Sequence, residues 1–122
     1  MPGQSAEERA AALLAAGVPD PLGNRVCMTP ASLEQVLGDH PDVTAESVLA
    51  AVTDPSAVWE HAWYMDSLVY EATVRVAAGH GRLMVVADRD PRNVVYVVTA
   101  FFPTREGYWE KNLGRRVWPN AS

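Results

Sequence analysis

The chain has 122 residues, of which 48% are hydrophobic and 20% are charged, enough for one compact domain and too few for two. No apolar run approaches the roughly 18–20 residues of a membrane-spanning helix, and a single cysteine, Cys27, excludes an internal disulfide or a cysteine-based zinc site. The polar, acidic N-terminus does not match a secretory signal, so we expect one cytoplasmic domain over residues 1–122 with no membrane contact.

The net charge of −5 argues at first against a nucleic-acid partner. The charges are unevenly distributed, however. Residues 1–74 hold 2 Lys and Arg against 11 Asp and Glu, whereas residues 75–122 hold 8 against 4. A basic second half favours an anion-binding face, although surface charges also cluster by chance.

Three helices are predicted in the first half of the chain. The first has a capping-box pair, Ser5 and Glu8, and Gly17 stands where a helix stop belongs. Two prolines and a glycine interrupt the pattern over residues 18–24. The second and third helices open at threonine N-caps, and the three expected spans are 5–17, 29–38 and 44–54, with Gly38 ending the second.

From residue 57 onward the hydrophobic pattern alternates as in β-strands. Four strands joined by turns are expected, at residues 57–64, 68–77, 82–88 and 94–102. Helices followed by hairpin-linked strands indicate an α+β fold, in which N-terminal helices pack on a four-stranded antiparallel β-meander. The domain divides into a helix and loop (1–28), a core (29–105) and a C-terminal tail (106–122), where we expect a short helix and then loose residues.

Motifs for metal or phosphate binding are absent, because His40, His61 and His80 never have the spacing of metal ligands and no glycine-rich phosphate loop occurs. A GxSxG nucleophile elbow is absent as well. We therefore expect no metal ion and no cofactor, and isolated polar side chains are the remaining candidates.

Two of these candidates are His40 and Thr99. His40 follows a predicted helix end, where the helix dipole favours a protonated imidazole, and a capping or surface role is the alternative. Thr99 carries a hydroxyl within an apolar strand, and strict alternation places it on the same side as Val95, Val97 and Phe101. A buried threonine can also satisfy its hydroxyl on the backbone.

Further candidates lie on the 68–77 strand and in the tail. Glu71, Thr73 and Arg75 share the polar side of the strand, and the alternative there is a solvent-facing sheet with a cross-strand ion pair. The tail mixes cations with aromatic rings, as single-stranded nucleic-acid sites do, or forms a solvated helix. Its candidates are Arg105, Lys111, Arg115 and Arg116, with Tyr108 and Trp109 among them.

Three segments together carry a resemblance to a known superfamily: "LEQVLGDHPDVTAESVLAAVTDPSAVWE", "YEATVRVAAGHGRLMVVAD" and "VVYVVTAFF". Their order and spacing resemble the barnase–EndoU–colicin–RelE (BECR) nuclease superfamily, most closely its phage-associated and polymorphic-toxin branches. The resemblance covers residues 30–105, and it implies N-terminal helices, one ending near a histidine, on a four-stranded antiparallel meander.

The resemblance implies a toxin-type, metal-independent endoribonuclease, in which a 2′-hydroxyl attacks the adjacent phosphodiester and leaves a 2′,3′-cyclic phosphate. It implies RNA and an immunity or antitoxin protein as partners, and a cytoplasmic location or delivery into a target cell within a larger toxin. The implied roles are His40 as general acid/base, Arg75 for the phosphorane charge, Thr99 for the phosphate, Arg105 and Lys111 for flanking phosphates, Tyr108 or Trp109 for base stacking, and Glu71 as an alternative base.

Two other functions fit the same sequence. One is a non-catalytic α+β binding module of phage or toxin-immunity type, whose acidic front half imitates nucleic acid. The other is a small-molecule enzyme with a pocket between sheet and helices, lined by Trp59, Trp63, Tyr64 and Tyr96.

Overall fold

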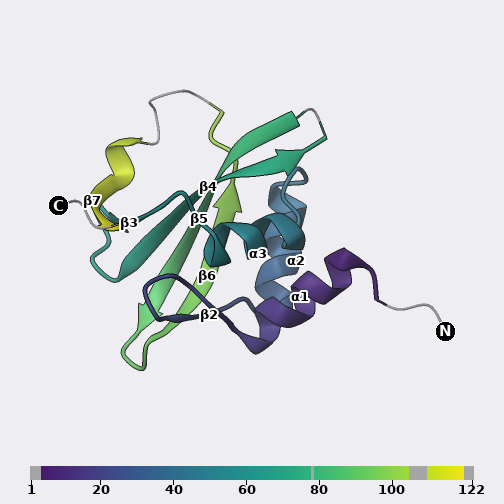
Figure 1. The fold of residues 1–122 in the computed structure, drawn as a ribbon, viewed down its shortest axis with the longest axis horizontal. Helices are drawn as coiled ribbons and strands as arrows, with labels where there is room; N and C mark the ends of the chain where they lie inside the picture. Colours follow the sequence, from purple (N-terminus) through teal and green to yellow (C-terminus); the bar gives the residue numbers. More distant parts are fainter. Residues whose placement is uncertain (1–3, 78, 105–109, 120–122) are drawn as a thin grey trace.

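The computed structural model describes residues 4–77, 79–104 and 110–119. Three helices precede the longer strands of a single sheet, and a 3₁₀ turn and a last strand follow them (Figure 1). The elements are α1 (Ala6–Ala16), β1 (Val18–Pro19), β2 (Arg25–Cys27), α2 (Pro30–Asp39), α3 (Ala45–Thr53), β3 (Ala57–His61), β4 (Ser67–Val76), β5 (Gly79–Asp90), β6 (Val94–Phe101), η1 (Glu110–Asn112) and β7 (Leu113–Trp118).

The helices begin at the expected residues, because each N-cap side chain accepts a hydrogen bond from the first turn. In α1 the Ser5–Glu8 capping box forms, and Gly17 ends the helix with a φ of 105°. The predicted stop at Gly38 is wrong. Gly38 has an ordinary helical place in α2, which continues to Asp39 and is capped by His40.

The α+β class is confirmed, but the predicted four-stranded antiparallel sheet does not match the structure. The sheet has seven strands in the order β1-β2-β6-β5-β4-β3-β7, and it is mixed because β2 pairs parallel with β6. The additional strands lie in residues 18–27, predicted as part of the loop that ends at residue 28, and in residues 113–118, predicted as loose. Strands of two and three residues are too short to show alternation, which explains why the first pair was missed.

The three helices lie on one face of the sheet and bury the main core against it (Figure 1). We call the other side of the sheet the open face. It holds a smaller apolar cluster of Val69, Met84 and Val86, with Trp59, Phe101 and Leu113 packed against it. The side chains of β4 follow the predicted alternation, so Glu71, Thr73 and Arg75 share the open face with Val69.

A β-bulge in β6 changes the direction of Thr99. Val86 pairs with Thr99 and Ala87 pairs with Val97, so Val98 has no direct partner on β5. Val97 packs in the main core, whereas Thr99 faces the open side opposite Val86. The prediction that Thr99 shares a side with Val97 is therefore wrong, because alternation restarts at the bulge.

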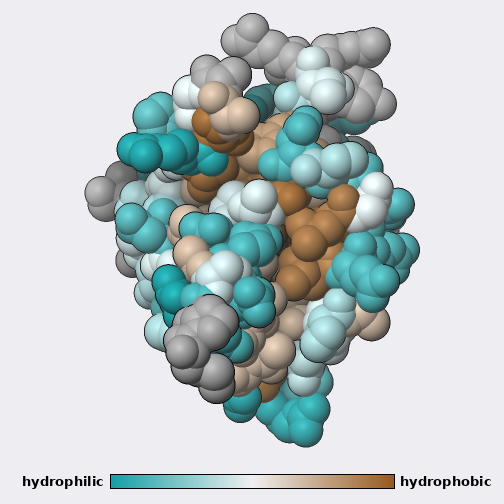
Figure 2. Space-filling model, turned by 90° about the vertical axis from the view of Figure 1, so that its right-hand side faces the viewer, coloured by the Kyte–Doolittle hydropathy of each residue, from teal (hydrophilic) through white to brown (hydrophobic). Residues whose placement is uncertain are grey.

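The helical side of the molecule has an apolar groove between α1 and α2. Its volume is about 360 Å³, and its lining consists of Ala11, Ala12, Ala15, Pro30, Leu33, Glu34 and Leu37. Figure 2 looks onto the side where these two helices lie and shows an apolar area hollowed between hydrophilic side chains. None of the helices in the described part of the chain is long and apolar enough to cross a membrane.

Candidate functional site

Two larger hollows lie beside the sheet, one where β4 and β5 meet the α2–α3 connection and one on the open face. The hairpin hollow, of about 1000 Å³, lies beside the β4–β5 hairpin and is lined by Pro41, Asp42, Thr44, Arg75, Val76, Ala77, Gly81, Arg82, Phe102 and Pro103. The loop hollow, of about 860 Å³, lies beside the β3–β4 connection and is lined by His61, Trp63, Tyr64, Met65, Asp66, Ser67, Val86, Asp88, Arg89, Val98, Thr99 and Phe101.

The hairpin hollow is lined by two arginines, Arg75 and Arg82, and by one carboxylate, Asp42. Arg75 pairs with His80 and Arg82 pairs with Thr73, so the two arginines are diagonal neighbours on one face of adjacent strands. Such neighbours have Cα atoms about 7–8 Å apart. Arg75 makes no side-chain hydrogen bond or ion pair with the described residues, so its guanidinium is available to an anion.

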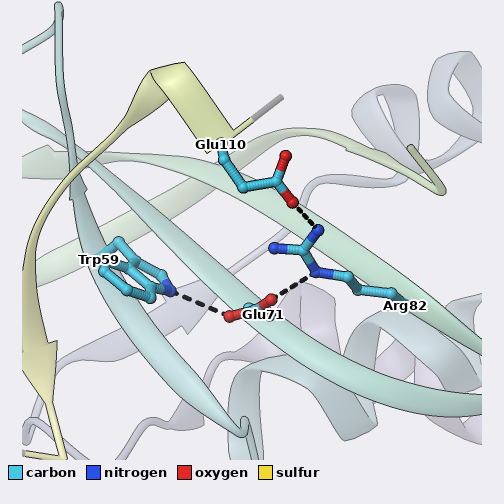
Figure 3. A network of polar contacts seen from close by, with 4 residues as sticks. All are labelled: Trp59, Glu71, Arg82 and Glu110. Atoms are coloured by element: carbon cyan, nitrogen blue, oxygen red, sulfur yellow. Dashed lines mark hydrogen bonds and ion pairs between the residues drawn. The ribbon is translucent and has the colours of Figure 1, made fainter. Parts of the chain in front are cut away.

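Arg82, by contrast, lies between two carboxylates (Figure 3). Its Nε donates to Glu71 Oε2 at 2.5 Å, its Nη1 donates to Glu110, and Trp59 Nε1 donates to the other oxygen of Glu71 at 3.1 Å. Burial lowers the pKa of Arg82, but its bonds to Glu110 and Glu71 outweigh burial and hold the pKa above its ordinary value. The bond to Arg82 in turn lowers the pKa of Glu110.

This network changes how Glu71 is interpreted. The alternative of a cross-strand ion pair is realised for Glu71, which pairs with Arg82 on the neighbouring strand β5 and not with Arg75. Both carboxylate oxygens of Glu71 are occupied, which leaves it poorly placed to take a proton from a substrate.

The loop hollow combines a neutral histidine, exposed aromatic rings and hydroxyls. His61 Nδ1 accepts from the backbone N–H groups of Trp63 and Tyr64, and burial lowers its pKa, so the ring is uncharged at neutral pH. Trp63 and Tyr64 are 69% and 66% exposed, which is unusual for residues of their size. The hydroxyl of Thr99 also lines this hollow and has no partner among the described residues. The alternative of a threonine satisfied by the backbone is thus not realised.

His40 lies next to residues that line each hollow. Its ring centroid lies 6.1 Å from that of Phe101, which lines the loop hollow. The next two residues, Pro41 and Asp42, line the hairpin hollow. The imidazole is half-buried, and His40 itself is in the lining of neither hollow.

The three predicted catalytic residues do not meet at one point. Arg75 lies opposite His80 and Thr99 lies opposite Val86, so six residues of β5 separate them. That separation is about 20 Å along a strand. Arg75 and Thr99 therefore cannot hold the same phosphate, and His40 lines neither of the hollows in which they lie.

Comparisons of this chain with protein-family models, curated proteins and solved structures found no match. The resemblance to BECR nucleases therefore remains a prediction from the order of its motifs. In the described residues, no group of three or more His, Cys, Asp or Glu side chains is placed to hold a metal ion.

The remaining predicted site residues belong to the C-terminal tail, of which the structure describes residues 110–119. Arg105, Tyr108 and Trp109 lie outside the described residues, whereas Lys111 is exposed in η1. In the described tail, Arg115 bonds to Glu60 at 3.0 Å, and Arg116 lies opposite Trp59 in the β3–β7 pair. The expected helix there is a single 3₁₀ turn, and both arginines belong to a strand.

The four aromatic residues predicted to line a pocket between sheet and helices do not line one common pocket. Trp63 and Tyr64 line the loop hollow, which opens on the other side of the sheet, while Trp59 bonds to Glu71 and Tyr96 is 40% exposed. The sequence interpretation also missed Arg82. Arg82 could have been found from the strand register. When Val76 and Gly79 close the hairpin, Arg82 lies opposite Thr73, on the same face as Glu71 and Arg75.

Proposed function

We propose that the chain is a metal-independent endoribonuclease that binds an RNA strand across the hairpin hollow and the loop hollow. The position of His40 carries the proposal. Its ring lies 6.1 Å from that of Phe101, which lines the loop hollow, and the next two residues line the hairpin hollow. A phosphodiester held between the two hollows would lie beside the imidazole.

The chemistry needs few groups. A 2′-oxygen attacks the adjacent phosphorus and gives up its proton, the bond to the 5′-oxygen breaks, and that oxygen takes a proton. The products are a 2′,3′-cyclic phosphate and a 5′-hydroxyl. His40 is the general acid/base, and its ring nitrogens bond to none of the described residues. Arg75 stabilises negative charge on a phosphate in the hairpin hollow.

Thr99 has a different role from the one that the resemblance implies. At about 20 Å from Arg75 along the sheet, it binds a phosphate or sugar of a neighbouring nucleotide. Trp63 and Tyr64 offer faces for base stacking, which contributes about 1–3 kcal/mol per base in single-strand binding. Asp66, Asp88 and Arg89 line the same hollow, so its charges are mixed and do not by themselves select a base over the backbone.

The arrangement of β3, β4, β5 and β6 supports this proposal. These strands are successive antiparallel neighbours in the sheet. We propose that they correspond to the meander of BECR nucleases, with β1, β2 and β7 as additions. On the same reading the chain is of toxin type, and an immunity protein would block it by covering the hairpin hollow.

The test is incubation of the purified chain with total RNA in EDTA, followed by analysis of the fragment ends. Cyclic phosphate ends are expected, and His40→Ala should slow cleavage by about 10²–10⁴-fold, the usual contribution of a general acid/base. Asp39→Ala is the matched control, because it changes the adjacent exposed residue of the same helix end.

Two outcomes would overturn the proposal. One is intact RNA at high protein concentration, which in combination with measurable RNA binding would assign the chain to the non-catalytic binding class. The other is cleavage that His40→Ala leaves unchanged, because a contaminating nuclease would then explain it.

A further inference from the structure

Arg82 is the second arginine of the hairpin hollow, and two carboxylates occupy its guanidinium (Figure 3). We infer that Arg82 is an anion-binding residue. In the unbound protein the carboxylate of Glu110 takes the position on Arg82 that a phosphate would take, and a bound phosphate displaces it. The inference rests on the proposed function in one respect, because the anion is taken to be a phosphate of the bound strand.

The two carboxylates hold Arg82 in different ways. Glu71 lies on the neighbouring strand β4, and its contact with Arg82 Nε at 2.5 Å is built into the sheet. Glu110 lies in η1, a three-residue turn, and it contacts Nη1, on the part of the guanidinium that Glu71 leaves open. Glu71 therefore orients the guanidinium, and Glu110 occupies the side that remains for a ligand.

The contact of Glu110 is incomplete. Only Oε1 bonds to Arg82, and Oε2 is buried without a hydrogen-bond partner among the described residues. A buried acceptor left unpaired costs free energy, and a carboxylate that bonds through one oxygen forgoes the bidentate geometry that arginine favours. A phosphate offers several acceptor oxygens where Glu110 offers one, so it competes well with Glu110 for the same N–H groups of Arg82.

Arg75 adds the second half of the site. It is the diagonal neighbour of Arg82 on the same face and makes no side-chain bond to the described residues. Two guanidinium groups at this spacing can both bind one phosphate. Arg75 can do so directly, whereas Arg82 can do so only after its contact with Glu110 breaks. Glu110 thus sets the affinity of the hollow without contacting the strand.

The test measures the affinity of the full chain for a fluorescein-labelled single-stranded oligodeoxynucleotide, which lacks the 2′-hydroxyl and is not cleaved. Glu110→Gln should tighten binding by about tenfold, the gain expected if Glu110 occupies Arg82 about 90% of the time. Glu110→Asp should act in the same direction, because the shorter side chain keeps the charge and loses the reach. In an Arg82→Gln background, neither change should have an effect.

The salt dependence supplies an independent readout. Arg82→Gln alone should weaken binding and lower the slope of log affinity against log salt by about 0.7, the value for one phosphate contact on a single strand. Glu60→Gln is the matched control, since it removes a carboxylate from Arg115, at 3.0 Å and outside the hollow. Thermal unfolding of each variant confirms that it is folded.

The inference is overturned if Glu60→Gln tightens binding as much as Glu110→Gln, because net charge would then explain the gain. It is also overturned if Glu110→Gln acts equally without Arg82, or if the wild-type chain does not bind the oligonucleotide. The affinities are independent of cleavage. If the variants bind the oligonucleotide as expected but the chain does not cleave RNA, only the proposed function is refuted. If the chain cleaves RNA but Glu110→Gln and Arg82→Gln bind the oligonucleotide like the wild type, only this inference is refuted.

Discussion

Thr99 lies opposite Val86 in the β5–β6 pair, and it faces the open side of the sheet although Val97 faces the helices. The bulge at Val98 separates these two directions. The bulge decides which side of the sheet the hydroxyl of Thr99 occupies. Without the bulge, the hydroxyl of Thr99 would be buried among the valines of the main core, and the loop hollow would have one polar group fewer.

Replacing Thr99 with valine should slow RNA cleavage by up to about 10-fold, because it removes one hydrogen bond to a neighbouring nucleotide, worth about 0.5–1.5 kcal/mol. Stability should change by less than about 0.5 kcal/mol, because the hydroxyl has no partner among the described residues. Thr73→Val, on the same face of β4, is the control and should cleave like the wild type. Equal rates for the two variants would remove Thr99 from the site.

Trp63→Ala should weaken RNA binding by about 1–3 kcal/mol if a base stacks on the indole. The fold should be unaffected, because the side chain is 69% exposed. Leu13→Ala is a suitable control, since Leu13 is also exposed, at 50%, but belongs to α1 on the helical side. Filter binding with an RNA that carries 2′-deoxy substitutions measures the difference, and identical affinities for both variants would exclude stacking on Trp63.

Tyr70→Phe should lower stability by about 1–3 kcal/mol at neutral pH. The hydroxyl of Tyr70 donates to Asp20 Oδ2 at 2.5 Å in the core, so the change removes one donor from a carboxylate that is 7% exposed. Denaturant unfolding measures the loss. An unchanged midpoint would mean that the backbone N–H groups of Leu22 and Asn24, which also donate to Asp20, hold it sufficiently.

The same tyrosine predicts a loss of stability in alkali. Burial, and then the bond to Asp20 and its charge, raise the pKa of Tyr70 in the folded state. Its contribution is therefore complete below the unfolded pKa of about 10 and falls above it, by about 1.4 kcal/mol for each pH unit. Tyr70→Phe should remove this part of the decline between pH 10 and 11.5. Parallel stability curves for the two proteins would contradict the prediction.

Two glycines should respond to alanine in opposite directions. Gly38→Ala should stabilise the chain by about 0.5–1 kcal/mol, because Gly38 lies inside α2 with open space around it. Gly17→Ala should destabilise it by about 1–2 kcal/mol, since Gly17 has a φ of 105° and an added Cβ would overlap the side chain of Arg25. Thermal unfolding measures both, and a destabilising Gly38→Ala would contradict its place in the helix.

The sequence by itself determined the features that arise within a few residues. Ser5, Thr29 and Thr44 cap their helices through bonds to groups three residues away, and the alternation of β4 shows which side chains share a face. These interactions depend on local geometry, so the pattern of residues is sufficient to predict them. The α+β class followed from the same local patterns.

Only the tertiary structure decided which side chains meet. The direction of Thr99 depends on a bulge that no residue in the sequence predicts. The partner of Glu71 is Arg82, because the register of the β4–β5 hairpin places that arginine beside it. Glu110 reaches Arg82 across 28 positions of the sequence, which no local pattern records. The pairing of distant strands is set by the packing of the whole core, and for this reason the sequence supplied the candidate groups while the fold divided them between two hollows.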